Sequence, residues 1–226
     1  MRIRFLLFSV LLGASVTVFG QDANNASDQD AAYIRTITTR SEKIVQTLEI
    51  SDSVKAKRVV TIIANQYRNL NSVYTDRDNQ IKNIRQKGLS KEETDSAIKK
   101  VEAAAEKRIE PLHASYLSTL SSELSAEQVT KVKDGMTYNV LHVTYKAYTD
   151  MIPSLTQQQK DQIMAWLVEA REHAIDGESS EKKHWWFGKY KGRINNYLSA
   201  QGYDINKERQ EWAKRIKEQA SQNSKK

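Results

Sequence analysis

The sequence of 226 residues predicts an all-α protein, most simply an irregular or elongated bundle of about six to seven helices. Apolar residues recur at helical spacing along most of the chain, and no alternating run long enough to form a strand is present. The chain contains only two prolines. Three capping boxes, in which paired side chains satisfy free backbone N–H groups, mark helix starts: Ser90 with Glu93, Ser125 with Gln128, and Thr156 with Gln159.

The first 20 residues have the features of a cleavable signal peptide. Arg2 and Arg4 supply a positive start, the stretch 5–18 is nearly all apolar, and small residues precede Gln21. A transmembrane anchor is the alternative, but the apolar run is short for a bilayer. The sequence therefore predicts a periplasmic or secreted protein that has no membrane anchor after cleavage.

The chain after the signal peptide begins with a polar stretch of small residues at 21–30, which we expect to be a disordered leader. Residues 31–226 are predicted to form a single all-α domain with a solvated C-terminal helix and tail. The predicted helices lie at about 28–47, 52–86, 91–122, 126–151, 157–176, 180–200 and 205–221.

Local signals define the ends of these helices. The second starts near Ser51 and ends at Gly88, because glycine readily ends a helix. The third follows the Ser90 capping box, and Pro111 predicts a kink or a break in it. The fourth and fifth follow the capping boxes at Ser125 and Thr156. The long second and third helices are expected to form a hairpin that projects from the domain.

Charge and cysteine content limit the kinds of site. Removal of Arg2 and Arg4 with the signal peptide lowers the formal net charge by two, from +7 to +5. This mildly basic balance favours acidic partners without requiring them. The chain has no cysteine, so neither disulfides nor thiolate metal ligands contribute. We expect no cofactor and no bound metal.

The stretch 181–204 concentrates six aromatic and five basic residues. On a helix, one side carries an apolar stripe that suits a core, and Trp185 falls on the opposite side with Lys189 and Asn196, with Arg193 at its edge. Large aromatic side chains that face away from a core are uncommon without a partner. The sequence thus predicts that this outer face binds a ligand.

Two glycines on this predicted helix, Gly188 and Gly192, each cost about 1 kcal/mol relative to alanine. Close approach by a ligand or by another helix would offset that cost, and the two alternatives remain open. An indole flanked by cations and an amide suits a saccharide, and the basic charge favours an acidic one. Nucleic acid is a poor ligand for an exported protein, so no nucleic acid partner is expected.

The predicted site is non-catalytic and consists of one wall and a second set of residues from neighbouring helices. The wall is Trp185, Lys189, Arg193 and Asn196, and the second set is Trp166, Asp134, Tyr138 and His184. Trp185 would stack on a sugar ring, while Lys189 and Arg193 would meet acidic groups or hydroxyls and Asn196 would orient the ligand. Asp134 would accept from a sugar hydroxyl or from Arg193. The alternative for Asp134 and the adjacent glycine is a helix crossing.

A catalytic or metal site is the weaker alternative. Glu169 and His173 stand four residues apart, as do Glu172 and Asp176, and His184 would face His173 across the turn that follows. An ordinary solvated helix face has the same spacing. No zinc-protease motif, nucleophile elbow or phosphate loop accompanies these residues, so the prediction leans away from an enzyme.

Three blocks of the sequence resemble a known family: IIANQYRNLN at 62–71, the block 124–148 around DGMTYN, and the block 155–204 that contains HWWFGKYKGR. The resemblance is to domain-of-unknown-function family 3826, whose members are secreted helical proteins of Gram-negative, polysaccharide-degrading bacteria. That family is described as sugar-binding. The resemblance therefore implies a role in polysaccharide utilisation and an oligosaccharide partner, but supplies no established site residues.

A second resemblance suggests a different function. LSAEQ at 124–128 and LTQQQ at 155–159 are similar to the L-T-x-x-Q signature of small periplasmic helical chaperones. The same letters also form a capping box with a leading leucine, which makes the signature poorly specific. A chaperone or protein-interaction function is thus the first alternative to saccharide binding, and a polysaccharide lyase or hydrolase is the second.

Overall fold

In the computed structural model, the backbone is described for residues 20–223 and the side chains for residues 30–222. The predicted signal peptide at 1–20 lies almost wholly outside the described residues. Within them the protein is all-α, with eight helices and no strand: α1 (Gly20–Gln46), α2 (Ser53–Arg85), α3 (Lys91–Glu123), α4 (Ala126–Met136), α5 (Val140–Met151), α6 (Gln157–Ile175), α7 (Ser180–Ala200) and α8 (Ile205–Asn223).

The three predicted capping boxes are all present. Ser90, Ser125 and Thr156 each accept a hydrogen bond from the backbone N–H three residues later, and the paired side chain returns a bond to the cap residue. Helix α2 is capped by Asp52, whose carboxylate accepts hydrogen bonds from the backbone N–H groups of Val54 and Lys55. Local sequence therefore determines where these four helices begin.

The start of α1 and the course of α3 at Pro111 differ from the prediction. Helix α1 begins at Gly20 and includes residues 21–30, the predicted leader. Helix α3 continues through Pro111 without a break. Pro111 is exposed, so its ring meets solvent rather than a neighbouring helix.

The predicted count of six to seven helices is too low, because the segment predicted as one helix at 126–151 is two. Tyr138 and Asn139 both have φ of 57°, in the left-handed region. The Asn139 N–H donates to the Asp134 carbonyl at 2.8 Å, and the Tyr138 N–H donates to that of Gly135 at 3.4 Å. This pair of bonds is the Schellman pattern that ends a helix. The chain therefore turns here, and α5 leaves α4 in a new direction.

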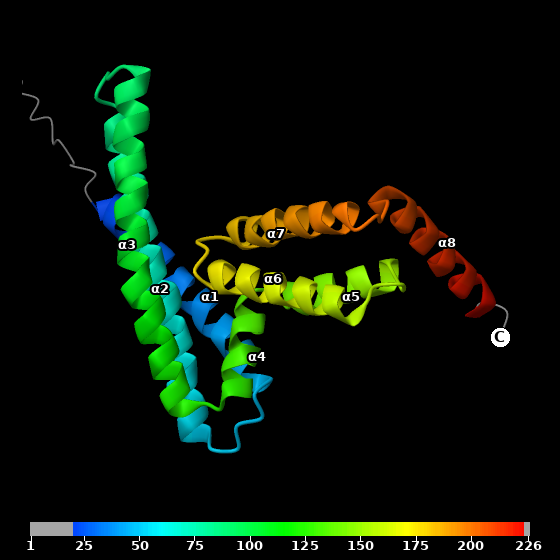
Figure 1. Ribbon diagram of the computed structural model, residues 1–226. Coiled ribbons are helices and arrows are strands. Elements are labelled where there is room, and N and C mark those ends of the chain that lie inside the picture. Colours follow the sequence, from blue (N-terminus) through cyan, green and yellow to red (C-terminus); the bar gives the residue numbers. More distant parts are fainter. Residues whose placement is uncertain (1–19, 224–226) are drawn as a thin grey trace, which may run out of the picture.

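Helices α2 and α3 form a long hairpin whose tip stands clear of the other described helices (Figure 1). No residue of α2 after Val73 is buried, and none of α3 before Ala105. The tip between them turns through Gly88, which has φ of 66°. A projecting hairpin, as the sequence predicted, thus rises beyond the packed part of the molecule.

The residues predicted as a single domain contain two hydrophobic clusters. The first joins α1, α2, α3 and α4 and includes Ile175 from the end of α6. The second joins α5, α6 and α7, with partly buried residues of α8 packed against it. Figure 1 shows α6 and α7 side by side, extending sideways from the hairpin. The end of α6 and the start of α7 consequently lie where the two clusters meet.

Two contacts fix the outer helices. An added Cβ at Gly135 of α4 would lie 2.8 Å from Cγ1 of Ile44, so α4 crosses α1 closely at this point. Arg215 of α8 donates to the carbonyls of Asp150 and Met151 at the end of α5, at 2.9 Å each. None of the described helices has the length and apolar character needed to cross a bilayer.

Candidate functional site

A cleft of about 890 Å³ lies between the α2–α3 hairpin and the turn that joins α6 to α7. Its volume is within the range of small-molecule sites. The residues that line it come from α2, α3, the end of α6 and the start of α7: Tyr74, Arg77, Glu102, Ala105, Glu106, Ile109, Glu110, His113, Glu172, His173, Asp176, Gly177, Glu178, Lys182, Trp185 and Trp186.

The wall from α7 is aromatic and basic. Trp185 is 53% exposed, and the ring of Trp186 lies edge-on to it, with centroids 5.0 Å apart. The amines of Lys182 and Lys189 lie 5.8 and 5.7 Å from the Trp185 ring centroid. Trp186 also stacks on His173 at 4.4 Å. This wall offers an open indole whose orientation is supported by neighbouring rings and cations.

The facing wall from α3 is acidic. Glu102, Glu106 and Glu110 follow one another at intervals of four residues, which places them on one face of the helix. All three are exposed, and none forms an ion pair with another described side chain. Ala105 and Ile109 lie between them along the cleft. These carboxylates are free to accept hydrogen bonds from a ligand.

Asp176, at the end of α6, connects the helices at the back of the cleft. The His113 Nδ1 atom lies 2.6 Å from an Asp176 carboxylate oxygen, and this hydrogen bond raises the pKa of His113 above its ordinary value. Gln66 donates to the other carboxylate oxygen at 3.4 Å. The Tyr74 hydroxyl donates to the Asp176 carbonyl at 2.6 Å. Residues from α2 and α3 thus hold the end of α6 in place.

Lys183 supports the same turn from α7. Its side chain is buried, and the ammonium donates to the Ile175 carbonyl at 2.9 Å. Burial lowers the pKa of Lys183 to about 8, while the nearby charge of Asp176 acts in the opposite direction. The amine also lies 5.7 Å from the centroid of the Tyr67 ring. The position of Trp185, two residues later, is therefore fixed by a buried contact.

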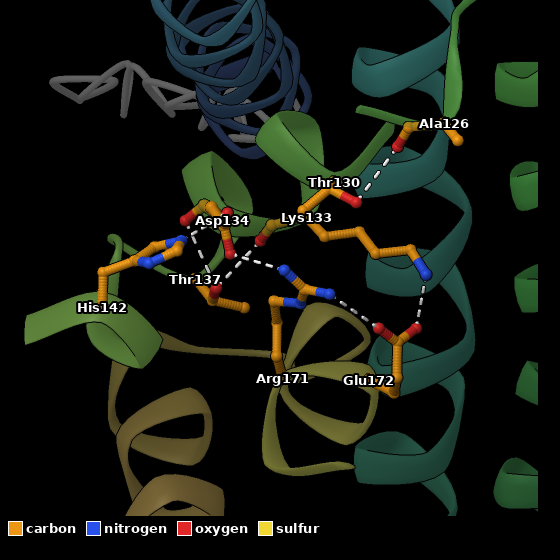
Figure 2. A network of polar contacts seen from close by, with 8 residues as sticks. All are labelled: Ala126, Thr130, Lys133, Asp134, Thr137, His142, Arg171 and Glu172. Carbon is orange, nitrogen blue, oxygen red and sulfur yellow. Dashed lines mark hydrogen bonds and ion pairs between the residues drawn. The ribbon is translucent and has the colours of Figure 1, made fainter. Parts of the chain in front are cut away.

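A second group of polar contacts lies between α4, α5 and α6 (Figure 2), and of its residues only Glu172 also lines the cleft. Asp134 accepts from Arg171 at 2.8 Å and lies 2.9 Å from His142 Nε2. Glu172 accepts from Lys133 at 2.6 Å and from Arg171 at 3.5 Å. Asp134 and Arg171 are both buried. This network joins the two hydrophobic clusters and has the character of a structural connection.

The structure brings the predicted site residues together in pairs rather than in one group. Trp185 and Lys189 are adjacent at the cleft. Arg193 lies over the Trp166 ring at 4.6 Å and pairs with Glu169, farther along α6 and α7. Only Trp185 of these residues lines the cleft itself.

The other four predicted residues lie elsewhere. Tyr138 stacks on His184 with centroids 5.7 Å apart, so His184 does not face His173 as the sequence suggested. Asn196 is exposed on α7. Asp134 accepts from Arg171 of α6 and contacts His142 of α5, and it does not accept from Arg193, which pairs with Glu169 instead.

The glycines of α7 distinguish between the two alternatives that the sequence left open. A Cβ added at Gly188 or Gly192 would meet no other atom of the described structure within 4 Å. No helix is therefore packed across them, and both are exposed. The cost of each glycine is not offset by a contact within the described part of the chain.

Sequence analysis did not assign Trp186, His113 or the three glutamates of α3 to the site. The interval of four residues from Glu102 to Glu110, with His113 three residues later, was the available signal for one polar helix face. Only the fold shows that this face meets α7. Among the described residues no cluster of three or more metal-ligating side chains is arranged to hold an ion.

Comparison with known proteins is consistent with the resemblance found in the sequence. The model of the family described as "Protein of unknown function (DUF3826)" matches residues 34–218. A comparison with curated proteins gave no significant match. The matched region extends from α1 to α8 and includes every residue that lines the cleft. The chain therefore belongs to the protein family DUF3826.

Proposed function

We propose that this protein binds an oligosaccharide, without catalysis, in the cleft between the α2–α3 hairpin and the start of α7. The observation that carries the proposal is the exposed indole of Trp185 at a cleft whose remaining walls are mostly polar. The C–H face of a pyranose ring stacks on an indole, and its hydroxyls need donors and acceptors around that ring. Lys182, Lys189 and Glu106 are available for these hydrogen bonds.

The open strip of α7 supports the same proposal. Gly188 and Gly192 lie beside Lys189 with nothing packed over them, so a ligand that extends from Trp185 can approach the helix backbone. Trp166 and Arg193 lie farther along α6 and α7, where a longer oligosaccharide would meet them. The predicted wall of Trp185, Lys189, Arg193 and Asn196 then forms the outer part of the site.

Titration of tryptophan fluorescence with a panel of oligosaccharides tests the proposal. We expect a saturable change with at least one sugar class and its loss in Trp185→Ala, while the free energy of unfolding changes little because the indole is half exposed. Trp212→Phe is the control, since Trp212 belongs to α8 and does not line the cleft. Failure of every oligosaccharide to bind, or equal binding by Trp185→Ala, would contradict the proposal.

The chaperone alternative has less support from the geometry. Both L-x-x-x-Q segments, at 124–128 and 155–159, form capping boxes, and Leu124 and Leu155 are buried. Helix initiation and core packing thus account for these letters. Suppression of aggregation of an unfolded client, independent of any sugar, is the result that would favour the chaperone function.

Only some of the catalytic candidates named from the sequence lie at the cleft, which weakens the enzyme alternative. Of its candidates, Glu172, His173 and Asp176 line the cleft, but Glu169 and His184 do not. Glu172 is already paired with Lys133, and His173 stacks on Trp186. Release of new reducing ends from a bound polysaccharide would establish catalysis, and its loss in His173→Ala would locate it.

Export to the periplasm or the medium is part of the proposal, because an oligosaccharide receptor must meet its ligand there. The N-terminal sequence of the protein recovered from cells tests it. We expect the recovered chain to begin at Gln21. Recovery of a chain that retains Met1 would contradict export by cleavage.

A further inference from the structure

The charge on the walls of the cleft differs in sign from the charge of the chain. Six carboxylates line it, from Glu102, Glu106, Glu110, Glu172, Asp176 and Glu178, against only two permanent cations, Arg77 and Lys182. The chain as a whole has a formal net charge of +7. Screening limits exposed charges to a range of about 8–10 Å at physiological salt, so the local charges decide which ligand is accepted.

Pairing within the protein separates these carboxylates into two kinds. Asp176 pairs with His113, Glu172 with Lys133, and Glu178 with Arg77. The carboxylates of α3 have no such partner among the described side chains. One face of α3 therefore presents uncompensated negative charge to the space in front of the indole.

The two walls offer complementary contacts to one ligand. The α7 wall offers the face of Trp185, whose quadrupole attracts C–H groups and cations, with the amines of Lys182 and Lys189 beside the ring. The α3 wall offers Glu102, Glu106 and Glu110, which attract ammonium groups. A uronic acid placed on the indole would be attracted by the amines of Lys182 and Lys189, but it would be repelled by the three unpaired glutamates of α3, which outnumber them. An amino sugar placed there would present its ring to Trp185 and its ammonium to α3.

We infer that the cleft selects oligosaccharides that carry free amino groups, such as glucosamine oligomers, over neutral ones, and neutral ones over uronic acids. This inference rests on the proposed saccharide-binding function, and it reverses the preference for acidic sugars that the net charge suggested. An exposed ion pair strengthens an interaction modestly, so contacts with two of the glutamates predict a preference of about three- to tenfold for the amino sugar over the neutral one.

Calorimetric titration of the full mature chain with three oligomers of equal length tests the inference. The probes are a glucose oligomer, a glucosamine oligomer and a glucuronic acid oligomer. We expect the glucosamine oligomer to bind most tightly and the glucuronic acid oligomer most weakly. The variant Glu102→Gln/Glu106→Gln/Glu110→Gln is expected to bind the glucose and glucosamine oligomers with equal affinity, and added salt should reduce the preference of the unmodified chain.

A matched control keeps the change in net charge but leaves the cleft intact. Glu42→Gln/Glu92→Gln/Glu218→Gln removes three exposed carboxylates that do not line the cleft. This variant should retain the full preference for the glucosamine oligomer. Equal loss of preference in the control would mean that net charge, not the α3 wall, decides selectivity, and would overturn the inference.

The remaining outcomes separate the inference from the proposed function. Binding of all three oligomers with equal affinity, or tightest binding of the glucuronic acid oligomer, would overturn the charge selectivity and leave saccharide binding in place. Absence of binding by any oligomer would contradict both. Binding of a lysine-containing peptide of equal charge, together with absence of binding by the glucosamine oligomer, would overturn the inference in favour of a basic protein segment as the ligand.

Discussion

The buried pair of Asp134 and Arg171 gives the sharpest test of how the site is built. The side chains are 11% and 8% exposed, and the closest nitrogen and oxygen are 2.8 Å apart. Removal of one member of a buried ion pair typically costs about 3–5 kcal/mol, because the other charge is left without a partner. Arg171 retains a longer contact with Glu172, at 3.5 Å. We therefore expect Asp134→Ala to lower the free energy of unfolding by about 3 kcal/mol.

Urea denaturation monitored by circular dichroism measures this change, and the expected fall in melting temperature is about 6–12 °C. Replacing Arg171 by Met in the Asp134→Ala background should recover much of the loss, since the uncompensated cation is then gone. Glu169→Ala is the matched control: it breaks the exposed pair with Arg193, where both side chains are more than half exposed, and should cost less than about 1 kcal/mol. If Asp134→Ala changed stability no more than the control while abolishing sugar binding, Asp134 would be a ligand residue and the structural assignment would be refuted.

Two further predictions concern the glycines and the titration of the cleft. Gly188→Ala and Gly192→Ala should each stabilise the protein by about 1 kcal/mol and weaken sugar binding. Gly135→Ala should instead destabilise the protein, because an added Cβ would collide with Ile44 of α1. Urea denaturation checks both signs, and a Gly135→Ala variant as stable as the unmodified protein would contradict the close crossing of α4 and α1. The hydrogen bond from His113 to Asp176 raises the pKa of His113, so its contribution to stability is complete below the ordinary histidine pKa of about 6.5 and is lost as pH rises through the higher folded-state value. Denaturation at about pH 6 and about pH 9 should show a fall in unfolding free energy that is smaller in His113→Asn, and equal falls would show that another group is responsible.

The sequence predicted those parts of the fold that depend on local interactions. Capping boxes at Ser90, Ser125 and Thr156 are satisfied by residues only three positions away, so no tertiary information was needed. The division of α7 into two faces was also predictable from helical periodicity. Phe187 is buried and Trp185 is 53% exposed, as expected for opposite sides of one helix.

The break between α4 and α5 was not predictable in this way. Left-handed backbone is rare for a residue such as Tyr138, and the glycine nearby, Gly135, lies within α4. The tertiary contacts of Gly135 with Ile44, and of Asp134 with Arg171, accompany the turn and come from distant positions. Periodicity alone therefore indicated one continuous helix.

The cleft required the fold for the same reason. Glu106 and Trp185 are almost eighty residues apart in the chain and line one cavity because the α6–α7 turn lies against the hairpin. A solvated helix face and a cleft wall have the same sequence pattern until the facing element is known. His113 shows the point well: sequence analysis did not assign it to the site, and the structure pairs it with Asp176 at the cleft.

Hydrogen–deuterium exchange tests the central claim, that the cleft is the ligand site, most directly. The mature protein would be measured alone and with the oligosaccharide that binds most tightly in the titrations. We predict slower exchange at the start of α7, at residues 182–189, and at 102–113 of α3, with no change in α8. Protection confined to α5 and α8, with none at the cleft, would contradict the account.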